Sequence, residues 1–161
     1  MHIRPLDASD WPQVERVYAE GIATGEATFE TEPPTWERWD AAHPSLRLVA
    51  ESDGAVLGFA ALSPYSPRRC YRGVAEESVY VGASARGRGV GRALLGELID
   101  RAEAEGYWTL LAGVFPENEA SVALHASCGF RVVGTHVGLG ERDGVWRDVL
   151  WLERRSSTTS R

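Results

Sequence analysis

A loop rich in arginine and glycine, which joins a short β-rich run to an amphipathic helix, is the feature that most constrains this chain. The loop consists of Arg86, Gly87, Arg88, Gly89, Val90, Gly91 and Arg92. The first turn of a helix leaves backbone N–H groups without partners, and the aligned peptide dipoles place partial positive charge there. Glycines let a ligand reach the backbone, and arginines add positive charge and hydrogen-bond donors. The loop therefore predicts a site that wraps a pyrophosphate.

The residues after the loop indicate a helix that packs on a sheet. Apolar side chains recur from Val90 to Ala102 at helical spacing, and Gly106 is a suitable helix stop. A short strand ending in Val79-Tyr80-Val81 precedes the loop. We therefore expect a strand, a phosphate-binding loop and an amphipathic helix in direct succession.

Spacing separates the known types of phosphate loop. A P-loop requires Lys-Ser or Lys-Thr after its second glycine, and this loop contains neither. A dinucleotide fingerprint requires a third glycine where Arg92 stands. A tight turn with solubilising arginines remains an alternative, but it seldom needs three glycines and three arginines within seven residues. The spacing Arg86-x-x-Gly89-x-Gly91 resembles the acetyl-CoA-binding motif of the GNAT superfamily of N-acetyltransferases.

Composition favours a single domain. It disfavours nonspecific binding of nucleic acid and gives no sign of a metal site. The chain has 161 residues and a net charge of −6, which disfavours nonspecific nucleic-acid binding. Cys70 and Cys128 are too few for a secreted disulfide framework, and neither cysteines nor histidines show the spacing of a metal site. No apolar run reaches signal-peptide or membrane-spanning length. We expect a cytosolic domain over residues 1–153, followed by a disordered tail over residues 154–161.

Periodicity and turn residues predict an α/β fold with one sheet covered by helices. The expected order is β-α-α-β-β-β-α-β-α-β-β. Strands are expected at residues 2–4, 46–51, 55–62, 77–81, 107–115, 130–139 and 145–153, and helices at about 7–21, 35–42, 90–105 and 119–127. This is also the order of the GNAT fold, and the resemblance implies a mixed, mostly antiparallel sheet of about six to seven strands flanked by about four helices.

Acetyl transfer to an amine needs a group that accepts the proton of the amine and donors that stabilise the developing oxyanion. Glu76, at the entry to the strand that precedes the loop, is the best candidate for the base, although a solvated strand-end carboxylate is the ordinary alternative. Backbone N–H groups of Val79, Tyr80 and Val81 could bind the acetyl carbonyl or the pantetheine arm if the strand is splayed or bulged. His125 is a second candidate, as a proton donor to the leaving thiolate or as a group that orients the substrate.

Several segments resemble the phosphinothricin acetyltransferase-like branch of the GNAT superfamily. His125 occupies a position where many superfamily members carry tyrosine, and histidine there is typical of this branch. Further likenesses are Phe29-Glu30-Thr31-Glu32-Pro33, Ala75-Glu76 before Val79-Tyr80-Val81, and Gly144-x-Trp146-x-Asp148-Val149. The resemblance implies acetyl-CoA contacts at Val79 to Val81, Gly87 to Arg92 and Asn118, with Glu76 as the base. It also implies a homodimer.

The same resemblance implies a small amino acid or analogue as the acceptor, of the phosphinothricin or methionine sulfoximine type. Arg69, Tyr71, Arg72 and Phe29 could supply cations and an aromatic wall for its polar head group. Asn118 could also serve as a helix N-cap, independently of any ligand. Two other functions remain open, namely acetylation of protein, peptide or aminoglycoside amines, and a non-catalytic acyl-CoA-binding module.

Overall fold

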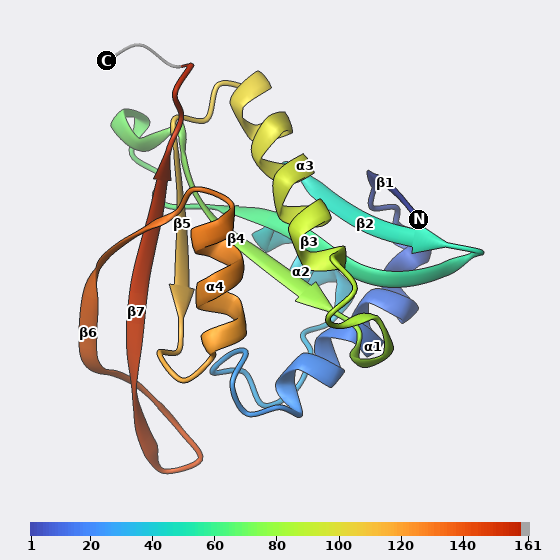
Figure 1. The fold of residues 1–161 in the computed structure, drawn as a ribbon, viewed down its shortest axis with the longest axis horizontal. Helices are drawn as coiled ribbons and strands as arrows, with labels where there is room; N and C mark the ends of the chain where they lie inside the picture. The colour runs from blue at the N-terminus through green and yellow to red at the C-terminus, as the bar shows by residue number, and fades with distance from the viewer. Residues whose placement is uncertain (159–161) are drawn as a thin grey trace.

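Residues 1–158 of the computed structural model form one seven-stranded sheet with the strand order β1-β2-β3-β4-β5-β7-β6 (Figure 1). The strands are β1 (His2–Pro5), β2 (Arg47–Ser52), β3 (Ala55–Pro64), β4 (Val74–Val81), β5 (Thr109–Val114), β6 (Arg131–Arg142) and β7 (Val145–Arg155). The helices are α1 (Trp11–Ile22), α2 (Trp36–Ala42), α3 (Val90–Ala104) and α4 (Glu119–Ser127). Short 3₁₀ turns lie at η1 (Ala8–Asp10), η2 (Arg69–Tyr71) and η3 (Ala83–Ala85).

The element order and the sheet type confirm the expected fold. Every neighbouring pair of strands is antiparallel except β4 and β5, which run parallel. Helix boundaries also follow local chemistry, since Thr35 accepts a hydrogen bond from the Arg38 backbone N–H at the start of α2. Asp7 caps the η1 turn that leads into α1.

The sheet separates two apolar layers because successive side chains of a strand point to opposite faces. Leu94, Leu95 and Leu98 of α3 are fully buried against one face, and α4 lies on the same side. Val14 and Val17 of α1, with Trp39 of α2, are buried against the other face. β3 supplies side chains to both layers, so it lies at the centre of the core.

β4 and β5 stay paired over only three residues of each strand. The parallel register joins residues 74–76 to residues 109–111, whereas β4 stays paired with β3 up to Val81. The two strands then diverge, as Figure 1 shows in green for β4 and in tan for β5. β4 begins at Val74, earlier than the expected residue 77, so Glu76 lies within the strand and at the point of divergence.

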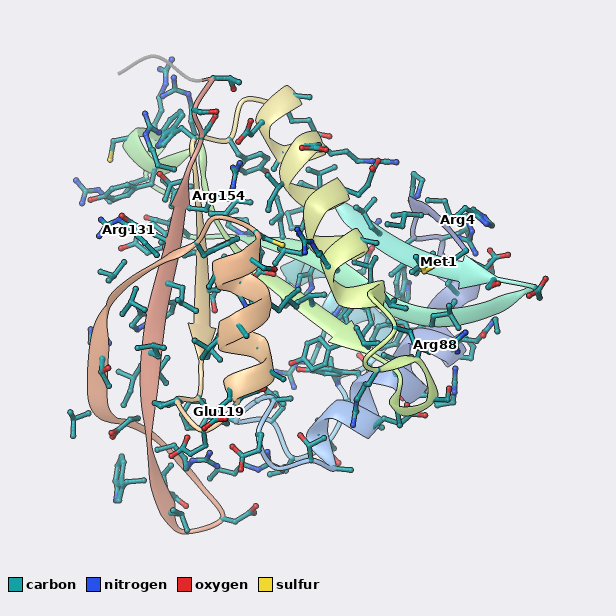
Figure 2. All side chains as sticks on the ribbon, viewed as in Figure 1. Met1, Arg4, Arg88, Glu119, Arg131 and Arg154 are labelled. Carbon is teal, nitrogen blue, oxygen red and sulfur yellow. The ribbon has the colours of Figure 1, made fainter. Side chains whose placement is uncertain are left out.

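The expected tail requires a correction at its first residues. β7 continues to Arg155 because β5 still offers backbone partners, with Leu110 opposite Arg154 and Thr109 opposite Arg155. The Arg154 side chain, labelled in Figure 2, also donates to Glu103 and to the Cys128 carbonyl. Residues 159–161 of the predicted tail lie outside the described residues. Within residues 1–158 no helix is long and apolar enough to cross a membrane.

Gly58 provides a test of how closely β3 and β4 pack under α3. A Cβ atom at this position would lie 2.6 Å from the Tyr80 carbonyl oxygen and 3.0 Å from a Leu94 methyl group. Because the carbonyl belongs to a paired strand, Gly58→Ala should lower the free energy of unfolding by about 1–3 kcal/mol, the usual cost of overpacking. Urea denaturation would measure this change.

Gly96 is the matched control for Gly58→Ala. It lies within α3, and nothing would come within 4 Å of a Cβ atom there. Gly96→Ala should therefore stabilise the protein by about 0.5–1 kcal/mol. Equal effects of the two substitutions would contradict the packing at Gly58.

Candidate active site

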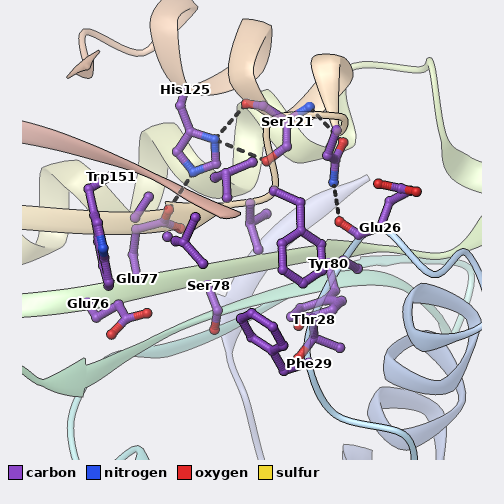
Figure 3. A pocket seen from close by; sticks show the side chains of 18 of the residues that line it. Glu26, Thr28, Phe29, Glu76, Glu77, Ser78, Tyr80, Ser121, His125 and Trp151 are labelled. Carbon is purple, nitrogen blue, oxygen red and sulfur yellow. Dashed lines mark hydrogen bonds and ion pairs between the residues drawn. The ribbon is translucent and has the colours of Figure 1, made fainter. Parts of the chain in front are cut away.

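A cavity of about 410 Å³ opens where β4 and β5 diverge (Figure 3). Its walls are residues 26–30 of the loop between α1 and α2, residues 76–80 of β4, and residues 112–115 at the end of β5. Residues 118, 121 and 125, at the start and along one side of α4, and the β6–β7 hairpin complete it. Glu76, Phe29, Asn118 and His125, four of the predicted site residues, are therefore brought together by segments distant in sequence.

Glu76 lines this cavity at the edge where β4 and β5 separate, and it remains open to solvent. The cavity walls nevertheless remove part of its hydration. This desolvation, followed by the negative charge of the adjacent Glu77, raises the pKa of the Glu76 carboxyl above its ordinary value. A raised pKa makes the Glu76 carboxylate a stronger proton acceptor, in keeping with the role predicted for it.

Glu77 lies on the opposite face of β4, where it meets His125 of α4. The His125 Nε2 atom is 2.5 Å from Glu77 Oε1, and the His125 Nδ1 atom is 2.7 Å from the Ser121 carbonyl oxygen. Both side chains are almost completely buried. Burial alone would lower the pKa of His125, but the hydrogen bond and charge of Glu77, together with the Ser121 carbonyl, raise it overall.

Glu77 is not among the site residues predicted from the sequence, although the spacing along β4 carries a signal for it. In β4 the buried Ala75 and the partly buried Val79 and Val81 face α3 and α4, and Glu77 falls in the same series of every second residue. Period-two spacing thus places Glu77 on the face covered by α3 and α4, and Glu76 on the face that α1 and α2 cover. His125 has both ring nitrogens engaged by protein groups, so neither points freely into the cavity. A direct proton-donor role for His125 stays a prediction.

Asn118 serves as the N-cap of α4. Its Oδ1 atom accepts a hydrogen bond from the Ser121 backbone N–H at 3.1 Å. Its Nδ2 atom donates to the Glu26 carbonyl, also at 3.1 Å. The amide therefore ties the loop between α1 and α2 to the start of α4, in addition to lining the cavity.

Two arginines of the β6–β7 hairpin hold the same loop. Arg142 donates to the carbonyls of Thr28 and Ile22 at 2.7 and 3.0 Å. Arg147 donates to the Gly25 carbonyl at 3.1 Å, and its guanidinium lies 4.1 Å from the centre of the Phe115 ring. No motif singled out these arginines, because the loop carbonyls that they bind lie more than a hundred residues away. Arg147 also donates to the carboxylates of Glu26 and Glu117.

The predicted substrate-binding residues divide into two groups. Phe29 lines the cavity and packs edge-to-face on Phe115, with ring centres 4.8 Å apart. Arg69, Tyr71 and Arg72 lie at the η2 turn before β4 and are absent from the cavity wall. Their role stays a prediction, and no arginine or lysine within residues 1–158 lines the cavity.

The arginine and glycine loop leads into α3 as predicted, and its residues have distinct roles. Gly87 and Gly89 adopt positive φ values of 71° and 80°, which favour glycine. Gly91 lies within α3, where a Cβ atom would be 3.2 Å from Leu124 of α4. Val90 is buried as the first residue of α3. The helix has no side-chain cap, so its first N–H groups stay available to an anion.

The three arginines of the loop also differ. Arg86 donates to the Val81 and Glu20 carbonyls at 3.2 and 3.3 Å, so it braces the loop. Arg88, labelled in Figure 2, and Arg92 are exposed, and neither has an ion pair within residues 1–158. These two guanidinium groups are the free cations beside the start of α3.

Residues 79–81 of β4 direct their side chains into the two apolar layers of the core. Val79 and Val81 pack into the α3 layer, and the Tyr80 ring stacks on Phe59 in the other layer, with centres 5.1 Å apart. Beyond Glu76 this segment has no pairing with β5, so its backbone groups on that side are open to a ligand. Over the described part of the chain, no group of three or more His, Cys, Asp or Glu side chains is placed to hold a metal ion.

Comparisons with known proteins agree with one another on the family. The family model described as "Acetyltransferase (GNAT) family" matches residues 8–130. A phosphinothricin N-acetyltransferase of Alcaligenes faecalis is 39% identical over 161 aligned residues, which cover 94% of this chain and 81% of the relative. An L-methionine sulfoximine/L-methionine sulfone acetyltransferase of Pseudomonas paraeruginosa is 31% identical, with 94% of this chain and 92% of the relative covered.

The fold comparison gives a similar result. A crystal structure of a GNAT superfamily phosphinothricin acetyltransferase from Sinorhizobium meliloti, in complex with AcCoA, superposes with a TM-score of 0.89. The two sequences are 31% identical, and the superposition covers 99% of this chain and 91% of the other.

Removal of Arg142 should release the loop between α1 and α2. Arg142→Ala deletes two charged donors to loop carbonyls, and hydrogen bonds of this type contribute about 1.5–3 kcal/mol each. We expect amide hydrogen exchange over residues 24–30 to accelerate by about tenfold or more, as local opening becomes easier. Hydrogen–deuterium exchange by mass spectrometry would measure it.

Arg131→Ala is the control on the same hairpin. Arg131 pairs with Glu153 on an exposed surface, and such ion pairs contribute little. Exchange in the loop should stay as in the unchanged protein. An Arg142→Ala protein with unaltered loop exchange would show that other contacts hold the loop.

Proposed function

The chain belongs to the acetyltransferase (GNAT) family, and from this premise we propose that it transfers acetyl from acetyl-CoA to the primary amine of a small amino acid or analogue. The observation that carries the proposal is the Glu76 carboxylate at the opening between β4 and β5. The relatives named for phosphinothricin and for methionine sulfoximine support an amino-acid analogue as the acceptor.

The residues around the arginine and glycine loop fit acetyl-CoA. An uncapped helix N-terminus, two glycines with positive φ and the unpaired Arg88 and Arg92 suit a pyrophosphate. The unpaired edge of β4 offers backbone groups to the pantetheine arm and to the acetyl carbonyl. In this assignment Gly87 to Arg92 and Val79 to Val81 form the acetyl-CoA site, while Arg86 and Asn118 hold the surrounding backbone.

The chemistry is a direct attack of the amine on the thioester. Glu76 takes a proton from the substrate ammonium, and the free amine nitrogen forms a bond with the acetyl carbon. The carbon–sulfur bond then breaks. The second proton of the amine nitrogen passes to the leaving thiolate, which gives the amide and free CoA, while Glu76 returns its proton to solvent.

The shape of the cavity supports a small acceptor. A volume of about 410 Å³ accommodates an amino-acid analogue between the aromatic rings of Phe29, Phe115 and Trp151. Arg69, Tyr71 and Arg72, beside the start of β4, remain the proposed partners of the anionic groups of such an acceptor. Acetylation of protein, peptide or aminoglycoside amines is not favoured, and neither is a non-catalytic module, because the two relatives named above are acetyltransferases of amino-acid analogues.

A homodimer in the cytosol completes the proposal. β6 is an edge strand, and its hairpin with β7 exposes apolar side chains, among them Val137 at 83% and Trp146 at 70% exposure. Open strand edges and apolar patches favour association. A second copy of the chain would cover them. The free cysteines Cys70 and Cys128 are in keeping with a reducing compartment.

Replacement of the base tests the proposed function. Glu76→Gln should lower kcat/KM for the best acceptor by about 10²–10⁴-fold, the usual contribution of a general base. Calorimetry should show unchanged acetyl-CoA binding. Thiol release would be measured with phosphinothricin, methionine sulfoximine, methionine sulfone, a peptide and an aminoglycoside.

The pH profile gives a second readout for Glu76. Because the base acts when deprotonated and its pKa is raised, kcat/KM should rise with pH along a limb above the ordinary Glu value of 4.5. This limb should be absent from Glu76→Gln. Glu15 is an exposed carboxylate on α1, so Glu15→Gln is the control and should retain full activity. Comparable rates in Glu76→Gln would remove Glu76 from the mechanism.

The proposed dimer predicts an effect of charge on the hairpin. A double substitution, Val137→Lys with Trp146→Lys, places two cations on the apolar patch and should convert a dimer into a monomer in sedimentation velocity. Ala19→Lys, at an exposed site of α1, is the control and should leave the mass unchanged. If the protein without these substitutions sediments as a monomer at all accessible concentrations, the dimer is excluded.

A further inference from the structure

We propose that Glu77 is a positioning residue of the active site, whose carboxylate holds His125 as a doubly protonated ring at the opening between β4 and β5. The inference rests on the proposed function for its catalytic consequence, but the protonation of His125 can be measured without turnover. It starts from a buried pair: the side chains of His125 and Glu77 are 3% and 1% exposed. Figure 3 shows the pair on the cavity wall, on the other side of β4 from Glu76.

The surroundings of the ring fix where its protons lie. The Ser121 carbonyl oxygen can only accept, so the His125 Nδ1 atom, 2.7 Å away, must carry a proton. The Nε2 atom lies 2.5 Å from Glu77 Oε1, which requires one proton between these two atoms. The pair is therefore either an imidazolium with a carboxylate or a neutral imidazole with a carboxylic acid.

The charges around the pair favour the imidazolium. No arginine or lysine within residues 1–158 lines the cavity, so His125 is the available cation for the Glu77 carboxylate. Glu77 contacts the ring from β4, whereas Glu76 lies on the other face of that strand. Within α4 the Ser121 carbonyl oxygen accepts from Nδ1 and the Ser121 hydroxyl lies 3.3 Å from the same atom. The Phe130 ring covers His125 edge-on, with ring centres 5.1 Å apart. The carbonyl oxygen can only accept, the Glu77 carboxylate accepts and carries negative charge, and the hydroxyl can accept as well as donate, so these neighbours together stabilise a doubly protonated ring.

The second oxygen of Glu77 strengthens this conclusion. Glu77 Oε2 is buried and has no hydrogen-bond partner within the described part of the chain. A buried carboxylate is costly unless it is paired. The contact with His125 is therefore the main compensation for the Glu77 charge, and loss of either partner leaves an uncompensated group.

The catalytic consequence follows from the position of the pair. A buried imidazolium beside the diverging strands supplies positive charge near the groups on which negative charge develops during acetyl transfer, the carbonyl oxygen and the leaving sulfur. The negative charge of Glu77 raises the pKa of Glu76 across β4, and the positive charge of the imidazolium reduces this effect. Glu77 thereby acts through His125 and needs no contact with the substrate.

The test is an NMR titration of the histidine rings in the full chain, with ¹⁵N-labelled histidine. In the unchanged protein, both His125 ring nitrogens should show imidazolium shifts at neutral pH. Glu77→Gln keeps the shape and the acceptor oxygen but removes the charge, so His125 should titrate at lower pH. Glu77→Asp retains the charge on a shorter side chain, so His125 should titrate at a pH between those of the unchanged protein and Glu77→Gln.

His43 provides an internal control in the same spectra. Its Nδ1 atom also lies 2.7 Å from a backbone carbonyl, that of Trp39, but His43 has no carboxylate partner among residues 1–158. Desolvation by burial, the largest effect, lowers the pKa of His43. His43 should therefore be neutral at neutral pH and should not respond to Glu77→Gln.

Steady-state kinetics test the catalytic consequence. In Glu77→Gln the decline of kcat at alkaline pH should move to lower pH together with the His125 titration, and a displacement of one pH unit corresponds to about a tenfold loss on that limb. A neutral His125 in the unchanged protein, or an identical titration in Glu77→Gln, would overturn the proposal. An unaltered pH profile alongside a shifted titration would overturn the positioning role. Absence of turnover with every amine would instead count against the proposed function, since the NMR result does not depend on activity.

Discussion

The divergence of β4 from β5 is the constraint on which the rest of this structure depends. The strands share three paired residues each, and β4 then continues with β3 alone. Paired strands lie less than about 5 Å apart, which leaves no room for a ligand between them. Their separation creates the cavity, frees backbone groups along β4 and places Glu76 at its edge. Other elements must close the space between the strands. These are α4, the loop between α1 and α2, and the β6–β7 hairpin.

These closing elements are held by contacts between segments distant in sequence. Arg142 and Arg147 reach the loop from the hairpin, Asn118 reaches it from the start of α4, and His125 reaches β4. The contacts use backbone carbonyls and one buried carboxylate as acceptors. The cavity is thus assembled from separate parts of the chain, and its shape depends on charged hydrogen bonds at its rim rather than on apolar packing alone.

Much of the fold and part of the site could be predicted from the sequence. The spacing of apolar residues and turns gave the order of all eleven helices and strands, and the loop from Arg86 to Arg92 indicated an anion site before α3. Glu76, Phe29 and His125, each predicted from the sequence as a site residue, all line the cavity, while their roles stay predictions. The β4 boundary and the start of the tail were wrong, because pairing with β5 extends both β4 and β7 beyond what their own residues indicate.

The sequence by itself determined the elements of this protein and its phosphate-binding loop, because both depend on residues that are close along the chain. Helical spacing, turn glycines and clustered arginines act locally. Only the tertiary structure decided that Glu77 is a buried partner of His125, that Arg86 braces the loop while Arg88 and Arg92 stay free, and that the η2 arginines lie outside the cavity. Those outcomes depend on which acceptor or charge another segment brings within about 3 Å, and no local pattern encodes that distance.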